Sequence, residues 1–243
     1  MERSVKNLID QNLEATDGEI GKVKDFYFDD DTWTIRYLVV TTGGWLSARK
    51  VLISPNALVQ HSWASGIFRA NLNREQVRNS PDIDTDKPVS RQQEEELANY
   101  YPWQPYWGAG FYQGGVWGII PLTPSVDRST IRNRETKTSS NGDQHLRSCK
   151  EVAGYHIHTA DGDVGHVNDF IMDDQTWKIS YLVGDTHNWI GGKKVLIAVR
   201  HIQEVQWENS KVVADMTVET IKNSPAIDKR VYNAREGKNA IVY

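Results

Sequence analysis

Apolar and polar residues alternate with a period of two in two separate parts of the chain. Residues 33–40 read WTIRYLVV, with aromatic or β-branched residues at every second position, and residues 177–183 read WKISYLV. This alternation, rich in residues that favour extended backbone, predicts half-buried β-strands. The sequence therefore predicts β structure in both parts of the chain.

The two parts belong to one internal repeat. At a constant offset of 144 residues, segment 17–84 aligns with segment 161–228 without a gap, and 28 of the 68 aligned pairs are identical. Such agreement indicates that a segment was duplicated, so each copy is expected to form the same structural unit. Units repeated on one chain commonly bury equivalent faces, and we expect the two copies to pack about an approximate two-fold axis.

Each copy is predicted to contain five or six short strands and one short helix. Asp-Gly at 17–18 and 161–162 indicates tight hairpin turns, and a Pro ends each expected helix. In the first copy the expected elements are strands at 21–28, 33–40, 50–53, 58–63 and 67–71, a polar turn at 29–32 and a helix at 73–78, matched by a helix at 217–222 in the second copy.

Short strands need closure to protect their edges, which favours small barrels over open sheets. The predicted fold class is therefore all-β, with two small β-barrels, each followed by a short helix. A long linker, first aromatic and Gly-rich and then polar, joins them. The predicted domains are a first barrel at 1–95, the arm and linker at 96–145, a second barrel at 146–230 and a tail at 231–243.

The repeat resembles the PRC-barrel family. The resemblance rests on DGEIGKVKDF, WTIRYLVV and KVLI in residues 17–53, and on DGDVGHVNDF, WKISYLV and KKVLI in residues 161–197. The tandem arrangement is similar to bacterial proteins with two such domains. The resemblance implies two small barrels. The family's settings include the cytoplasmic domain of the photosynthetic reaction-centre H subunit and the C-terminal domain of a ribosome maturation factor.

Composition narrows the compartment and the partners. The net charge is −4, without the basic surface that binds a phosphate backbone, so no nucleic-acid partner is expected. There is no run of 18 apolar residues and no signal-like apolar start, so no membrane span is expected. The predicted location is the cytoplasm, with attachment to the periphery of a membrane complex as an alternative.

Two carboxylates, Asp25 and Asp169, occupy equivalent places inside predicted strands. A buried carboxylate can act as a general base if it is desolvated. A carboxylate inside a strand more often accepts backbone N–H groups or anchors a turn. Because both copies carry the residue in the same frame, the structural interpretation is favoured.

Other candidate chemistry finds little support in the sequence. His156 and His158, with His166 and His187 further along, could suggest a metal site, but the first copy has Asn12, Glu14, Lys22 and Gly43 at those positions. Asp29–Asp31 lacks the spacing of a calcium loop. Cys149, the single cysteine, has His145 nearby in sequence only. No catalytic residue, cofactor or metal is expected.

The segment 100–121 is unusually aromatic and is interleaved with Gly and Pro. It is interpreted as an arm that packs on its own barrel, as a partner-binding arm, or as a disordered linker. If it binds a partner, the contact residues are expected to be Tyr101, Trp103, Trp107, Phe111, Tyr112 and Trp117.

The predicted function is a non-enzymatic protein-interaction or scaffold module, with a protein partner or self-association as a homodimer or an intramolecular pseudo-dimer. One alternative is an accessory of a photosynthetic or redox electron-transfer complex, by analogy with the reaction-centre H subunit. Another is an accessory of RNA processing or ribosome maturation, but the negative net charge of the chain argues against this role.

Overall fold

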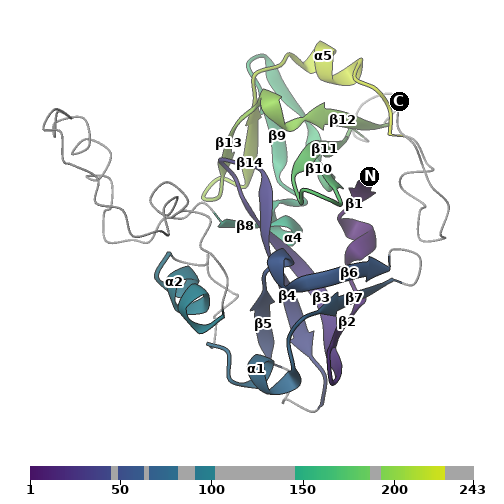
Figure 1. The fold of residues 1–243 in the computed structure, drawn as a ribbon. Coiled ribbons are helices and arrows are strands. Elements are labelled where there is room, and N and C mark those ends of the chain that lie inside the picture. Colours follow the sequence, from purple (N-terminus) through teal and green to yellow (C-terminus); the bar gives the residue numbers. More distant parts are fainter. Residues whose placement is uncertain (45–48, 63–65, 82–90, 102–145, 187–192, 228–243) are drawn as a thin grey trace, which may run out of the picture.

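The structure is a computed structural model that describes residues 1–44, 49–62, 66–81, 91–101, 146–186 and 193–227. We call the described residues up to Tyr101 the first half and those from Leu146 onward the second half. Each half contributes to a seven-stranded, mainly antiparallel sheet (Figure 1). The predicted all-β class and the two small barrel-like units are confirmed.

The two sheets have the same strand order. The first runs β5-β4-β3-β2-β7-β6 and the second runs β12-β11-β10-β9-β14-β13. The strands of the first are β2 (Asn12–Ala15), β3 (Gly18–Asp29), β4 (Thr34–Thr42), β5 (Lys50–Ile53), β6 (Leu58–Ser62) and β7 (Ile67–Ala70). Those of the second are β9 (His156–Thr159), β10 (Gly162–Asp173), β11 (Ile179–Asp185), β12 (Lys194–Ala198), β13 (Ile202–Gln206) and β14 (Lys211–Ala214).

The seventh strand of each sheet comes from the other half of the chain. Strand β1 (Glu2–Ser4) pairs antiparallel with β10 in the second sheet. Strand β8 (Leu146–Ser148) pairs antiparallel with β3 in the first sheet. The registers are equivalent, since Ser4 lies opposite Ile171 and Ser148 lies opposite Tyr27. The two halves have therefore exchanged a strand.

This exchange corrects the expectation that each repeat closes its own sheet. The reason is a difference in strand length, because β3 has 12 residues whereas its neighbour β2 has only 4. Strand β2 covers the beginning of one edge of β3, and β8 covers its end at Tyr27–Asp29. An uncovered strand edge would present unpaired backbone groups. The second half repeats this arrangement with β9 and β1 on β10.

Glycine at positions 21 and 165 allows the long strands to pass very close to their neighbours. A Cβ atom at Gly21 would lie 2.0 Å from the Thr41 carbonyl oxygen, and one at Gly165 would lie 2.0 Å from that of Asp185. No side chain fits at such a distance from backbone. The close approach of each long strand to its neighbour therefore requires glycine, which explains its identity in both copies.

One hydrophobic cluster contains buried residues of both halves. Phe28 of β3 and Phe170 of β10 meet with their ring centroids 5.5 Å apart. Trp177 of the second half lies 6.4 Å from Phe26 and 6.3 Å from Phe68 of the first half, centroid to centroid. The core is thus shared between the two halves, although the sequence predicts a separate barrel for each copy.

The helices predicted after each barrel are present. Helix α1 (Arg74–Arg78) begins behind Asn73 and helix α5 (Val218–Lys222) behind Thr217, whose side chains accept hydrogen bonds from the first turn. Two helices were not predicted, namely α2 (Arg91–Tyr100) and α4 (Cys149–Val152). The domain boundaries drawn from the repeat stay a prediction, although β1 and β8 cross between the two sheets.

Candidate functional site at the junction of the two halves

The carboxylate of Asp25 binds the segment that arrives from the second half. Its Oδ2 atom accepts a hydrogen bond from the Ser148 hydroxyl at 2.5 Å, and its Oδ1 atom accepts one from the Lys150 backbone N–H at 3.0 Å. Oδ1 also accepts from the backbone N–H of Phe26 at 2.7 Å. All three donors are within hydrogen-bonding distance, so Asp25 fixes the start of α4 beside β3.

Asp169 does the same for the segment that arrives from the first half. Its Oδ2 atom accepts from the Ser4 hydroxyl at 2.6 Å, and Oδ1 accepts from the Lys6 backbone N–H at 3.0 Å. The backbone N–H of Phe170 completes the set at 2.7 Å. Each donor lies at the 144-residue offset from its counterpart at Asp25. The junction is therefore an isologous contact between two copies of one sequence.

Both carboxylates are buried, with 8% of Asp25 and 2% of Asp169 exposed. Burial raises the pKa of each carboxyl above its ordinary value, because the low-dielectric surroundings disfavour the charged form. The hydroxyl and backbone donors lower each pKa again, but by less than burial raises it. The two sites thus have the same electrostatic character as well as the same geometry.

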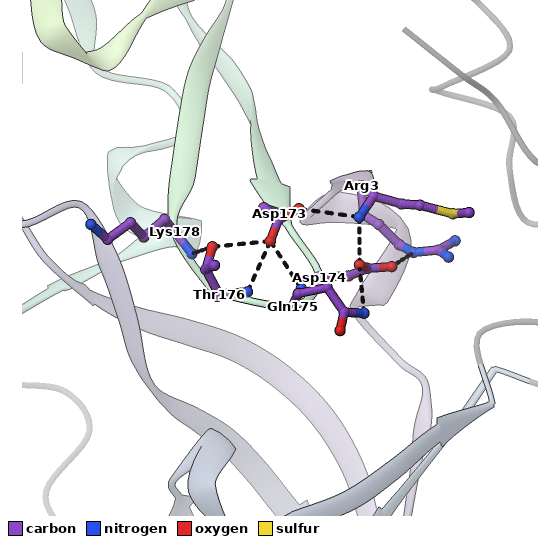
Figure 2. Close-up of polar contacts among 7 residues, drawn as sticks. Arg3, Asp173, Asp174, Gln175, Thr176 and Lys178 are labelled. Carbon is purple, nitrogen blue, oxygen red and sulfur yellow. Dashed lines mark hydrogen bonds and ion pairs between the residues drawn. The ribbon is translucent and has the colours of Figure 1, made fainter.

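Ion pairs from the middle residue of each added strand reinforce the exchange. The Arg147 Nε atom of β8 lies 2.6 Å from Asp30 Oδ2, and the Arg3 Nε atom of β1 lies 2.8 Å from Asp174 Oδ2. Figure 2 shows the second pair, with Asp173 beside it holding the turn through the backbone N–H groups of Gln175 and Thr176. Both ion pairs are largely buried, so solvent screens them less than surface pairs.

The backbone adds a third symmetric contact where the turns of the two halves meet. Ile35 N–H donates to the Trp177 carbonyl at 2.9 Å, and Ile179 N–H donates to the Trp33 carbonyl at 2.7 Å. Both tryptophans have a positive φ, 53° and 58°. Bulky residues rarely adopt this conformation, and here the hydrogen bonds within the turns and between them hold it.

Sequence reasoning found the two aspartates but not their partners. Arg3 and Ser4 match Arg147 and Ser148 at the same offset, outside the segment from which the repeat was recognised. Extending the alignment upstream would have shown this identity. It would not have shown that each Arg-Ser pair serves the opposite half.

Of the remaining sequence candidates, Cys149 lies at the junction itself, between Ser148 and Lys150. Cys149 is buried, and burial, with the nearby carboxylates of Asp25 and Asp169, raises the pKa of its thiol. A thiol held neutral is a poor nucleophile. His145, its suggested companion, lies outside the described residues.

The histidines lie on the surface of the second sheet. His156 pairs across β9 and β10 with His166, and His158 Nδ1 contacts Asp163 at 2.6 Å. His187 is outside the described residues. Within the described part of the chain, no three histidine, cysteine or acidic side chains converge in a way that could hold a metal ion.

The turn at 29–31 is built by its own first residue. The Asp29 carboxylate accepts hydrogen bonds from the backbone N–H groups of Asp31 at 3.1 Å and Thr32 at 2.8 Å. Asp30 pairs with Arg147, as described above. These carboxylates therefore shape the turn and bind the opposite half.

Of the six aromatic residues proposed as a partner-binding arm, the structure describes only Tyr101. It follows α2 and is 1% exposed, and burial raises the pKa of its hydroxyl to about 12. Its ring therefore packs on its own chain. Trp103, Trp107, Phe111, Tyr112 and Trp117 lie outside the described residues.

Comparison with known proteins agrees with this architecture. The PRC-barrel domain matches residues 1–67 and 147–221, together more than half of the chain. The chain therefore belongs to the PRC-barrel family. A search of curated proteins gave no match. None of the helices in the described ranges has the length and apolar character needed to span a bilayer.

The raised pKa values predict a pH-dependent stability that depends on Asp25 and Asp169. The pKa of each carboxyl in the folded state lies above the ordinary value of 3.8. At pH values between 3.8 and the raised pKa, the native state therefore holds more protons than the unfolded state. The free energy of unfolding should then fall as the pH rises through this window. Replacing both residues by Asn keeps one acceptor oxygen in each side chain and removes the titration.

Urea unfolding of the wild type and of the double variant Asp25→Asn/Asp169→Asn, at several pH values from 4 to 7, measures this difference. We expect the stability of the variant relative to the wild type to increase with pH. The comparison cancels other titrating groups, including Asp173, whose pKa is lowered to about 2 because its hydrogen bonds outweigh the effect of burial. A constant difference across the range would contradict the raised pKa values.

Proposed function

We propose that this chain is a non-enzymatic protein-interaction module of the cytoplasm, in which a rigid pair of barrels carries a partner-binding aromatic segment. The observation that carries the proposal is the state of Asp25 and Asp169. Each of these buried carboxylates already accepts three hydrogen bonds from the protein. A general base needs a lone pair directed at its substrate. The residues best suited to catalysis therefore serve to join the two halves.

The aromatic segment supports an interaction role because its first residue is fixed. Tyr101 is buried at the end of α2, so the residues after it begin at a defined point on the first barrel. Large aromatic side chains dominate the energetics of many interfaces. Trp103, Trp107, Phe111, Tyr112 and Trp117 thus give the segment the composition of a binding surface.

Deletion of residues 103–121 should abolish partner capture and leave the fold intact. The deletion keeps Tyr101, whose removal would disturb the core. The measurement is affinity capture of the tagged full chain, followed by mass spectrometry, with the captured protein then purified and its binding measured directly. A deletion of equal length in the polar stretch, residues 123–141, is the matched control.

We expect binding to be lost with the first deletion and kept with the second. Equal binding by both variants would show that residues 103–121 are not the partner surface. A failure of the wild-type chain to bind any protein, in capture and in direct measurement, would contradict the interaction role itself.

A further inference from the structure

The second sheet has an apolar outer face that is separate from the shared core. Ile171, Val183, Tyr181, Leu196 and Ile227 form this cluster, which we call the second outer face. Ile171 and Val183 are buried, but the side chains at 181, 196 and 227 are only partly buried. No helix in the described ranges contributes a residue to this cluster.

The equivalent face of the first sheet is more deeply buried. Its residues, at the 144-residue offset, are Tyr27, Tyr37, Val39 and Leu52, all buried and all part of the main cluster. Leu52 is 1% exposed, whereas its counterpart Leu196 is half-buried. The same residue type at the same place in the sheet therefore has a different cover.

Helix α2 and the residue that follows it supply apolar side chains to the main cluster, which is shared by the two halves. Leu97 is fully buried, Tyr101 is 1% exposed, and both belong to the main cluster. Residues four apart lie on one side of a helix, so this side of α2 faces the protein. The Tyr100 hydroxyl donates to the Gln76 carbonyl at 2.9 Å and holds the end of α2 beside α1. In the view of Figure 1, α2 lies to the outside of β5.

The chain itself approaches the second outer face at the end of the described residues. Leu196 N–H donates to the Pro225 carbonyl at 3.0 Å, and Ile227 N–H donates to the Lys194 carbonyl at 3.1 Å. Residues 225–227 thus run along the edge of β12 and place Ile227 in the second outer face. Whatever follows Ile227 starts beside this surface.

Beyond Asp84 and Asp228, where the aligned repeat ends, the same offset can be continued to the position that corresponds to Leu97. The offset pairs Leu97 with Ile241, and it pairs the exposed Glu96 with Ala240. Ile241 is flanked by Ala240 and Val242, so the segment has apolar side chains to bury. Covering Tyr181 and Leu196 would remove apolar surface from water, the main favourable term in such contacts.

We propose that the C-terminal segment 235–243 binds in cis over the second outer face, with Ile241 in the place that Leu97 has in the first half. This contact would complete the pseudo-symmetry of the two barrels. The contact would also cover an apolar surface that is otherwise accessible to a partner protein.

Paramagnetic NMR on the full chain tests the proposal. A nitroxide is attached to the variant Tyr243→Cys, since the native Cys149 is buried and does not compete for the label. We expect the methyl signals of Ile171, Val183 and Leu196 to lose intensity when the nitroxide is paramagnetic. Adding Ile241→Asp should restore them, whereas Ala240→Asp, which mimics the exposed Glu96, should not.

A mixed sample separates the possible occupants. Mixing nitroxide-labelled chains without isotopes and isotope-labelled chains without nitroxide reports contact between two copies. Unchanged shifts of core methyls such as that of Ile157 show that each variant is folded. The proposal is overturned if the three outer-face methyls keep their intensity in the labelled chain. It is equally overturned if they lose it to the same extent in the mixed sample, which would make a second copy the occupant.

Discussion

Replacement of Trp177 by Ala is expected to destabilise both halves of the protein together, by about 4 kcal/mol. Trp177 belongs to the second half, but its ring packs against Phe26 and Phe68 of the first half. Its removal leaves a cavity between the sheets, and the lost contacts come from both sides. Because the core is shared, the cost should appear as one cooperative unfolding transition shifted to lower denaturant.

Urea unfolding followed by far-UV circular dichroism and by tryptophan fluorescence measures this effect. Trp207→Ala is the matched control, since Trp207 is 42% exposed and its indole N–H donates to Glu151 at 2.5 Å. Surface substitutions of this kind usually change stability by less than about 1 kcal/mol. Two transitions in Trp177→Ala, with one at the wild-type midpoint, would show that the halves fold independently.

Local patterns in the sequence predict most of the individual elements. Strand β5 occurs at the predicted residues 50–53, and the Asp-Gly hairpins connect β2 with β3 and β9 with β10. These elements depend on alternation and turn residues close together in the chain, which a single sequence displays. Helix α2 is not among the predicted elements, although its Gln, Glu and Leu residues favour a helix.

The relation between the halves could not be predicted from the same patterns. Strands β1 and β8 have three residues each, too few to show a period. Their place depends on the length by which β3 and β10 extend beyond β2 and β9, and this becomes apparent only when the strands are paired. The candidate site likewise becomes apparent only when the strands are paired. Asp25 and Asp169 stand out as polar residues in apolar strands, whereas Ser4 and Ser148 look like ordinary polar residues until the exchange brings them into contact.

The exchange also implies that a substitution in one half should destabilise the strand that the other half contributes. In Asp169→Ala, the Ser4 hydroxyl and the Lys6 N–H lose their acceptor inside the protein, which costs about 1–3 kcal/mol for each group. Relief of the buried charge offsets part of this cost, so we expect a net loss of about 2 kcal/mol.

The location of the effect is the sharper test of Asp169→Ala. Hydrogen exchange should accelerate at Val5 and Lys6, at the beginning of the chain, because the Val5 N–H bond to the Phe170 carbonyl depends on the same junction. Asp25→Ala should instead accelerate exchange at Lys150. Asp169→Asn, which keeps an oxygen acceptor, is the control and should protect Lys6 nearly as well as the wild type. If Asp169→Ala lowered global stability but left exchange at Val5 and Lys6 unchanged, the carboxylate would not be the group that holds the exchanged strand.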